Sequence, residues 1–128
     1  MVTKQTFHLR PDGEKAFGYA QAVKVDNTLH LAGALSVNDA FEPQHPGDMS
    51  AQVADVYESV GRTLREFGAS LADVVKETIY VTDMDAFLAA NALRIHAYAG
   101  HLPATTVVQV QRLAFPECLV EIEVTAVI

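Results

Sequence analysis

The chain has 128 residues, of which 50% are apolar and 20% are charged, and these values are typical of one globular domain spanning residues 1–128. Folding at this length buries roughly two thirds of the surface that the unfolded chain exposes, so stability requires neither a disulfide nor a metal ion. Nine Lys and Arg against sixteen Asp and Glu give a net charge of -7 without a basic cluster. Phosphate binding relies on positive charge, so we expect no nucleic-acid partner.

The single cysteine, Cys118, cannot form an internal disulfide, and the first ten residues contain no apolar stretch typical of an export signal. Both features favour a cytoplasmic protein. No run approaches the roughly 18 consecutive apolar residues of a membrane-spanning helix, so we expect no membrane partner.

The first predicted elements are two strands, residues 21–25 and 28–33. Asp26 and Asn27 between them tolerate positive φ, which predicts a hairpin turn. The following residues, 38–48, contain Pro and Gly and show no hydrophobic periodicity, so they predict a loop.

Two segments predict amphipathic helices. Residues 50–67 have apolar side chains at three- and four-residue steps, and Gly68 stands at the position of a C-cap. The second helix begins at Asp83 or Asp85, either of which can cap it, and ends at Gly100. Its predicted apolar face consists of Phe87, Leu88, Asn91, Ile95 and Tyr98.

Three further segments predict strands: residues 74–82 between the helices, then residues 105–111 and 119–127 on either side of a turn around Pro116. In the first of these, the predicted inward side is Val75, Ile79 and Val81, and the opposite side is Lys76 and Thr78.

The last strand indicates how the sheet is covered. Val120, Ile122, Val124 and Ala126 point one way, and Glu121, Glu123 and Thr125 point the other. Two helices can cover only one face, and the opposite face mixes acids with apolar side chains. This pattern favours a homo-oligomer with clefts between subunits, and the alternative is a monomer with one solvated face.

Several separated motifs within residues 15–128 occur together. They are Gly18-Tyr19-Ala20-Gln21-Ala22-Val23, Leu31-Ala32-Gly33, Ser70-Leu71-Ala72-Asp73-Val74-Val75-Lys76, Val81-Thr82-Asp83-Met84-Asp85, Asn91, Pro103-Ala104 and Leu119-Val120-Glu121-Ile122-Glu123. In this order the motifs resemble the Rid (YjgF/YER057c/UK114) family of reactive-intermediate deaminases.

The resemblance implies an α+β, chorismate-mutase-like fold, with a mixed β-sheet and two helices packed on one face. It also implies a homotrimer with a central barrel and three clefts between subunits. The activity it implies is hydrolysis of small enamines and imines, such as 2-aminoacrylate and its imine, to a keto acid and ammonia. The implied partner is a small-molecule metabolite, and no metal or organic cofactor is implied.

Four site residues follow from the resemblance. Tyr19 lines the cleft, the backbone of Gly33 approaches the ligand, Asn91 faces the cleft from a helix, and the carboxylate of Glu121 directs a water molecule as the catalytic group. Each of these residues also has a purely structural interpretation. Tyr19 packs in the core, Gly33 forms a β-bulge, the amide of Asn91 bonds to the backbone, and Glu121 is a solvated acid on a strand.

One position departs from the family pattern. Deaminases of the family resemble one another in a Pro-Ala-Arg-Ser run whose arginine clamps the substrate carboxylate, whereas this chain has Thr105 at the arginine's place. Losing such a charged contact typically weakens binding by a factor of roughly a thousand. Arg94, on the same helix face as Asn91, is a candidate replacement, and the alternative is a solvated surface arginine. Thr105→Arg is expected to create or raise activity toward amino-acid-derived imines.

Other reactive residues do not form a recognisable site. Cys118 has no histidine placed by the sequence to activate it, and the five histidines do not converge as zinc ligands would, so we expect no metal. The prediction is a protein that hydrolyses or binds a small reactive enamine- or imine-type metabolite and is not a typical 2-aminoacrylate deaminase. The alternatives are a non-catalytic small-molecule-binding or regulatory trimer and, disfavoured by the acidic charge, an endoribonuclease.

Overall fold

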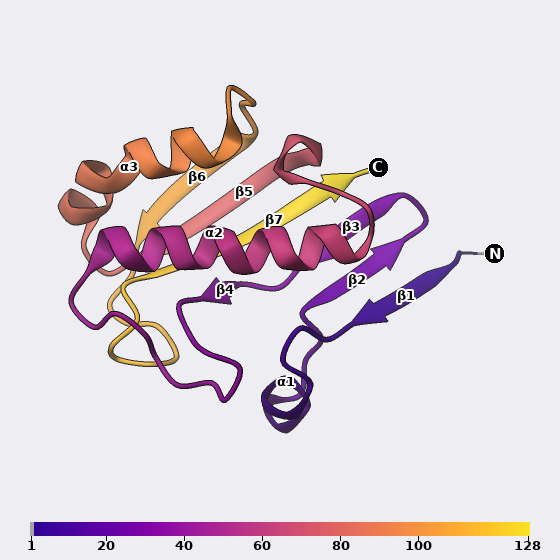
Figure 1. Ribbon diagram of the computed structural model, residues 1–128, viewed down its shortest axis with the longest axis horizontal. Helices are drawn as coiled ribbons and strands as arrows, with labels where there is room; N and C mark the ends of the chain where they lie inside the picture. The colour runs from indigo at the N-terminus through magenta and orange to yellow at the C-terminus, as the bar shows by residue number, and fades with distance from the viewer. Residues whose placement is uncertain (1) are drawn as a thin grey trace.

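The computed structural model describes residues 2–128, and in it two long helices lie over the same face of one β-sheet (Figure 1). In chain order the elements are β1 (Lys4–Phe7), α1 (Pro11–Phe17), β2 (Ala22–Val25), β3 (Thr28–Leu31), β4 (Ala34–Leu35), α2 (Met49–Glu66), the short 3-10 helix η1 (Leu71–Asp73), β5 (Val74–Val81), α3 (Met84–Tyr98), β6 (Ala104–Gln109) and β7 (Val120–Val127).

The sheet is mixed, as predicted for an α+β fold. The strand order is β1-β2-β3-β7-β5-β6, and β4 also pairs with β7. β5 and β6 are parallel, with α3 as the crossover that a parallel pair requires, and the other pairs are antiparallel. β6 therefore forms one edge of the sheet, and β7 brings its residues between β4 and β5.

The hairpin, the loop and both long helices lie where the sequence predicts them. Asp26 in the hairpin turn has a φ of 52°. The second hairpin strand ends at Leu31, two residues earlier than predicted, before the chain continues into β4. Asp48, in the predicted loop, caps α2 by accepting a hydrogen bond from the backbone of Ala51, and Asp83 caps α3.

The N-terminal strand and helix have no counterpart among the predicted elements. α1 has only seven residues, begins with Pro11 at its first turn and ends before Gly18, whose φ is 91°. Such a short helix shows no measurable hydrophobic periodicity, so its only sequence signals are the proline at its start and the glycine after its end.

The predicted buried face of α3 is partly wrong. Phe87 and Tyr98 are buried, but Leu88 and Ile95 are 58% and 57% exposed. Ala90 takes the inward position instead. α3 carries apolar residues on more than one side, so periodicity alone does not select the face that packs on the sheet.

The predicted inward side of β5 is also wrong at one residue. The pairing with β7 shifts register between Val74 and Lys76, so Val74 is buried and Val75 is 47% exposed. Such a bulge reverses the alternation on one side of it. Beyond the bulge, Glu77 shares the inward face with Ile79 and Val81.

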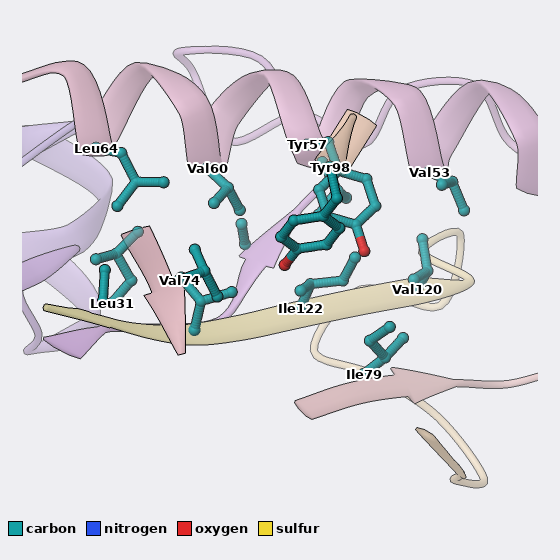
Figure 2. Packing of buried hydrophobic residues seen from close by; sticks show 14 of the residues in the cluster. Leu31, Val53, Tyr57, Val60, Leu64, Val74, Ile79, Tyr98, Val120 and Ile122 are labelled. Carbon is teal, nitrogen blue, oxygen red and sulfur yellow. The ribbon is translucent and has the colours of Figure 1, made fainter. Parts of the chain in front are cut away.

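The core lies between α2 and the sheet (Figure 2). Val53, Val60 and Leu64 of α2 face Val120 and Ile122 of β7, and all five are almost fully buried. Burying each of these side chains contributes roughly 1.5–3 kcal/mol. This face is filled by packing, so a site must lie on the open face, at an edge or around buried polar groups. Of the helices described, none is long and apolar enough to cross a membrane.

Candidate functional site

A pocket of about 250 Å³ brings together three of the predicted site residues, Tyr19, Gly33 and Glu121. Tyr19 follows α1, Gly33 precedes β4, and Glu121 lies on β7 opposite Leu35 of β4. The pairing of β4 with β7 thus places the glycine backbone beside the carboxylate.

Gly33 approaches the side chain of Glu121 more closely than any other residue type would permit. A Cβ atom at position 33 would lie 2.6 Å from Cδ and 2.9 Å from Oε1 of Glu121. The predicted close approach to the backbone is therefore made by the predicted catalytic carboxylate. A side chain at position 33 would displace that carboxylate.

The surroundings of Glu121 favour its protonated form. Burial raises the pKa of Glu121, and the nearby carboxylate of Glu123 raises it further. Glu123 is itself held in place, because it accepts a hydrogen bond of 2.8 Å from the hydroxyl of Tyr80. A carboxylate with a raised pKa is a better general base near neutral pH than an ordinary glutamate.

Tyr19 presents a protonated hydroxyl to the same pocket. Burial raises its pKa, the carboxylates of Glu14 and Glu121 act in the same direction, and the cation of Arg10 opposes them. A phenol that keeps its proton can both donate and accept a hydrogen bond. Tyr19 can therefore orient a polar ligand beside Glu121.

Two further predicted site residues, Arg94 and Thr105, contact Glu77, a fully buried residue that the sequence analysis did not single out. One oxygen, Oε1, accepts from Nε of Arg94 at 2.8 Å and from the hydroxyl of Thr105 at 3.0 Å. The other, Oε2, accepts from the hydroxyls of Tyr57 at 2.7 Å and Tyr98 at 2.6 Å. Four donors thus satisfy one buried carboxylate.

The two tyrosines pack edge to face, with ring centroids 5.7 Å apart, between α2 and the sheet (Figure 2). Burial and the carboxylate of Glu77 raise the pKa of Tyr57 and of Tyr98. Both hydroxyls therefore remain donors to Glu77. A signal for this cluster was present in the sequence, since Glu77 has the same parity as Ile79 and Val81 in its strand.

The sheet separates the two groups of predicted residues. Thr105 pairs with Glu77, and Glu77 pairs with Val124, so all three lie on the face that the helices cover. Glu121 has the opposite parity to Val124 in β7 and lies on the open face. Within one chain, Arg94 and Thr105 therefore lie apart from the pocket that holds Glu121.

Asn91 lies on α3 one turn before Arg94 and is half-buried. Its side chain makes no hydrogen bond to any of residues 2–128. The alternative of a backbone partner is thus not observed, and the amide is available to a ligand or to a neighbouring chain.

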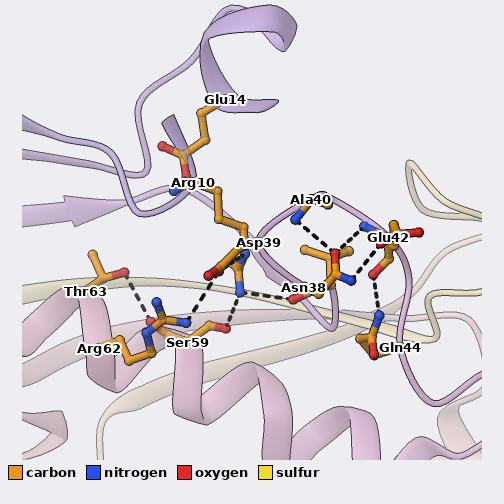
Figure 3. A network of polar contacts seen from close by, with 11 residues as sticks. Arg10, Glu14, Asn38, Asp39, Ala40, Glu42, Gln44, Ser59, Arg62 and Thr63 are labelled. Atoms are coloured by element: carbon orange, nitrogen blue, oxygen red, sulfur yellow. Dashed lines mark hydrogen bonds and ion pairs between the residues drawn. The ribbon is translucent and has the colours of Figure 1, made fainter. Parts of the chain in front are cut away.

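Arg10 also lines the pocket and has no counterpart among the predicted site residues. It is only 7% exposed, and its Nη2 donates to the carbonyl of Val37 at 3.0 Å and to the hydroxyl of Ser59 at 3.2 Å. Its Nε lies 3.5 Å from Asp39 Oδ1 (Figure 3). Burial lowers the pKa of Arg10, although Asp39 opposes this effect. Arg10 thus ties the loop before α2 to the helix.

Cys118 does not have the environment of a nucleophile. Burial, with the carboxylates of Glu117 and Glu121, raises the pKa of its thiol to about 11, so the reactive thiolate is scarce at neutral pH. Within the range 2–128, no three His, Cys, Asp or Glu side chains converge as a metal site would require.

Comparison with known proteins identifies relatives over almost the whole chain. A family model described as Endoribonuclease L-PSP matches residues 11–128. A RutC family protein of Pyrococcus abyssi is 35% identical over 108 residues, which cover 84% of each chain. The 2-iminobutanoate/2-iminopropanoate deaminase of Mus musculus is 31% identical over 85% of this chain and 80% of its own. The 3-aminoacrylate deaminase RutC of Acinetobacter baylyi is 33% identical over 81% of this chain and 82% of its own.

Solved structures show the same fold. A Mycobacterium tuberculosis member of the YjgF/YER057c/UK114 family superposes with a TM-score of 0.85 at 31% identity, covering 98% of this chain and 100% of the other. Mmf1 of yeast superposes with a TM-score of 0.87 at 28% identity, covering 98% of both chains.

Proposed function

The chain belongs to the YjgF/YER057c/UK114 family, the family of the endoribonuclease L-PSP model, and on that premise we propose that it hydrolyses the C=N bond of a small enamine- or imine-type metabolite. The reaction takes place in the pocket that holds Tyr19, Gly33 and Glu121. The observation that carries the proposal is the half-buried carboxylate of Glu121, which is packed against the Gly33 backbone and has a raised pKa. The names of the mouse and Acinetobacter relatives support the same reaction type.

Glu121 moves the protons in this mechanism. Its carboxylate takes one proton from a water molecule as the water oxygen bonds to the imine carbon, and the nitrogen receives the C=N electron pair and a proton from solvent. The Glu121 carboxyl then returns its proton to the nitrogen, the C–N bond breaks as the hydroxyl on the carbon loses its proton to solvent, and ammonia leaves a neutral carbonyl product. Overall, one imine and one water give one carbonyl compound and one ammonia. An enamine first gains a proton at carbon to become the imine. Tyr19 holds the polar end of the substrate through its hydroxyl.

We further propose that the working unit is a homotrimer, in which Asn91, Arg94 and Thr105 of one subunit complete the pocket of the next. Three features support assembly. β6 is an edge strand with one unpaired side. Leu88 and Ile95, seven residues apart on α3, are exposed apolar side chains on one helix face. The open face of the sheet mixes the charged residues Lys76, Glu121 and Glu123 with the aromatic side chain of Tyr80, a pattern that favours contact with another subunit.

Thr105 distinguishes the proposed reaction from that of a 2-aminoacrylate deaminase. Its hydroxyl is already engaged with Glu77 and with Nη2 of Arg94, so position 105 offers no free cation to a substrate carboxylate. We therefore assign the pocket to imines that do not depend on a carboxylate clamp. The family model's name suggests RNA cleavage, but a chain with a net charge of -7 lacks the positive surface on which RNA binding relies.

The test is direct. Imines are generated freshly in the presence of purified protein, both 2-iminopropionate and imines without a carboxylate, and ammonia release is compared with the uncatalysed rate. We expect acceleration by the wild type and its loss in Glu121→Gln and in Gly33→Ala, whose Cβ atom displaces the carboxylate. Glu117→Gln, which changes a nearby exposed carboxylate outside the pocket, is the matched control and should retain the wild-type rate.

Failure to accelerate any of these imines would reject catalysis. Saturable binding of the carbonyl products without catalysis would then indicate the non-catalytic binding protein, and cleavage of RNA would indicate the ribonuclease.

A further inference from the structure

Three phenylalanine rings from distant parts of the chain meet at the pocket that holds Glu121. They are Phe17 at the end of α1, Phe41 in the loop before α2 and Phe115 in the loop between β6 and β7. The ring centroids of Phe17 lie 5.6 Å from Phe41 and 6.3 Å from Phe115, and Phe41 and Phe115 are also 6.3 Å apart. We call these three residues the phenylalanine wall.

The phenylalanine wall is accompanied by three local features that are unfavourable in themselves. Phe41 has a φ of 59°, in the left-handed region that bulky side chains rarely adopt. A Cβ atom at Gly13 would lie 2.2 Å from Cδ2 of Phe41, so α1 requires glycine at its third residue for the ring to fit. Phe17 is 65% exposed, although burial would stabilise it. None of these features is explained by packing in the core.

We propose that the phenylalanine wall binds an apolar substituent on the imine carbon, so that the preferred substrates are imines with aryl or branched alkyl side chains. The inference rests on the proposed function and adds the class of substrate to it. Glu121 and the three rings line one pocket, so a substrate whose reacting carbon lies at the carboxylate would direct its substituent against the rings.

The size of the pocket and its charges agree with this substrate class. A closed apolar cavity of about 150 Å³ accommodates benzene, and this pocket has about 250 Å³, which leaves room for a C=N group beside a phenyl ring. The guanidinium groups are largely engaged within the chain. Arg94 is bound to Glu77, and Nη2 of Arg10 is occupied by Val37 and Ser59. Nε of Arg10 makes no hydrogen bond to residues 2–128, but it is buried and lies 3.5 Å from Asp39 Oδ1. We therefore assign the recognition of the substituent to apolar contact with the rings.

The test compares imines made in situ from phenylalanine, leucine and alanine by an amino-acid oxidase. We expect kcat/KM for the phenylalanine- and leucine-derived imines to exceed that for the alanine-derived imine by about tenfold or more, because one methylene in an apolar pocket already discriminates by roughly 10–200-fold. Phe17→Ala removes an exposed ring, and Phe41→Asn replaces the ring by a residue that tolerates positive φ. Both should reduce this ratio toward one.

Two further variants keep the test independent of folding defects. Gly13→Ala retains all three rings but displaces that of Phe41, and it should lower the ratio although alanine favours the helix. Phe7→Ala removes a ring from a similar edge-to-face pair, with Phe67 at 6.0 Å, outside the pocket, and should leave the ratio unchanged.

The outcomes separate this inference from the proposed function. Equal kcat/KM for all three imines, or a ratio that Phe17→Ala and Phe41→Asn leave unchanged, overturns the phenylalanine wall while hydrolysis stands. If no imine is hydrolysed, calorimetric binding of phenylpyruvate in preference to pyruvate, lost in Phe17→Ala, supports the wall and rejects only the reaction. Absence of that preference overturns the wall as well.

Discussion

Nη2 of Arg94 lies 2.6 Å from the hydroxyl oxygen of Thr105, and both side chains contact the buried carboxylate of Glu77. The family resemblance leads us to expect an arginine at the strand position that Thr105 occupies. In this chain a guanidinium reaches that position from α3, and a buried carboxylate holds it.

This arrangement refines the expectation for Thr105→Arg. A second guanidinium at 105 would lie beside Arg94 and share one carboxylate with it, and like charges at such distances destabilise each other. We expect Thr105→Arg alone to lower stability and to gain little activity, whereas Thr105→Arg with Arg94→Met keeps the charge constant and should raise kcat/KM for 2-iminopropionate by about tenfold or more. Steady-state kinetics and thermal unfolding measure both effects. If Thr105→Arg alone gains as much activity as the double variant, the guanidinium of Arg94 does not prevent the introduced guanidinium from binding the substrate carboxylate.

Removing the charge of Glu77 should lower the free energy of unfolding more than removing an exposed charge does. Glu77→Gln leaves Arg94 without its buried anion, and breaking such a pair typically costs about 3–5 kcal/mol of unfolding free energy. Glu77→Gln with Arg94→Met removes both charges and keeps an acceptor for the hydroxyls of Tyr57 and Tyr98, so it should be more stable than Glu77→Gln alone. Urea unfolding measures the difference.

The matched control is the exposed pair of Glu58 and Arg65, whose atoms lie 3.5 Å apart. Exposed pairs contribute about 0–1 kcal/mol, so Glu58→Gln should change stability little. An effect of Glu77→Gln as small as that of Glu58→Gln would mean that the carboxylate of Glu77 does not stabilise the core.

Much of the fold could be predicted because alternation and turn chemistry are local. The last strand and the hairpin were predicted from residues adjacent in sequence. The bulge at Val74 and Val75 was not, because it arises from the register with β7 rather than from the strand itself. The face of α3 was wrong at Leu88 and Ile95 because the helix is apolar on more than one side.

The candidate site depends even more than the fold on contacts between distant segments, which local sequence patterns do not predict. Tyr19, Gly33 and Glu121 were named from the family resemblance, and the structure brings these three into one pocket. The phenylalanine wall comes from three segments between 17 and 115, and no local pattern connects them. Nor does spacing indicate that Arg94 meets Thr105 on the far side of the sheet from Glu121, because that contact depends on the parallel pairing of β5 with β6.

The raised pKa of Glu121 predicts a pH dependence. A base must be deprotonated to act, so a raised pKa moves the rising limb of kcat/KM above about pH 4.3, the value for an ordinary glutamate. Glu123→Gln removes the neighbouring negative charge and keeps an acceptor for Tyr80, so it should lower the pKa of Glu121 and shift this limb to lower pH. The enzymatic rate is measured after subtraction of the uncatalysed rate at each pH.

Glu58→Gln, on the exposed face of α2, serves as the control and should leave the profile unchanged. If kcat/KM instead falls with rising pH, Glu121 acts as an acid. If Glu123→Gln does not shift the pH profile of kcat/KM, another group controls the rate.

The shared pocket leads to a last prediction, which concerns pairs of inactive variants. Glu121→Gln removes the base from one side of the proposed cleft, and Asn91→Leu removes an amide without a hydrogen-bond partner in residues 2–128 from the other side. Each variant alone should lose most of the activity. If the cleft lies between subunits of a trimer, heteromers purified by two different affinity tags regain about a third of the wild-type sites, because in each mixed trimer one cleft of three combines the two intact halves. Sites built within one chain regain none, and a doubly tagged species could not be purified from a monomer.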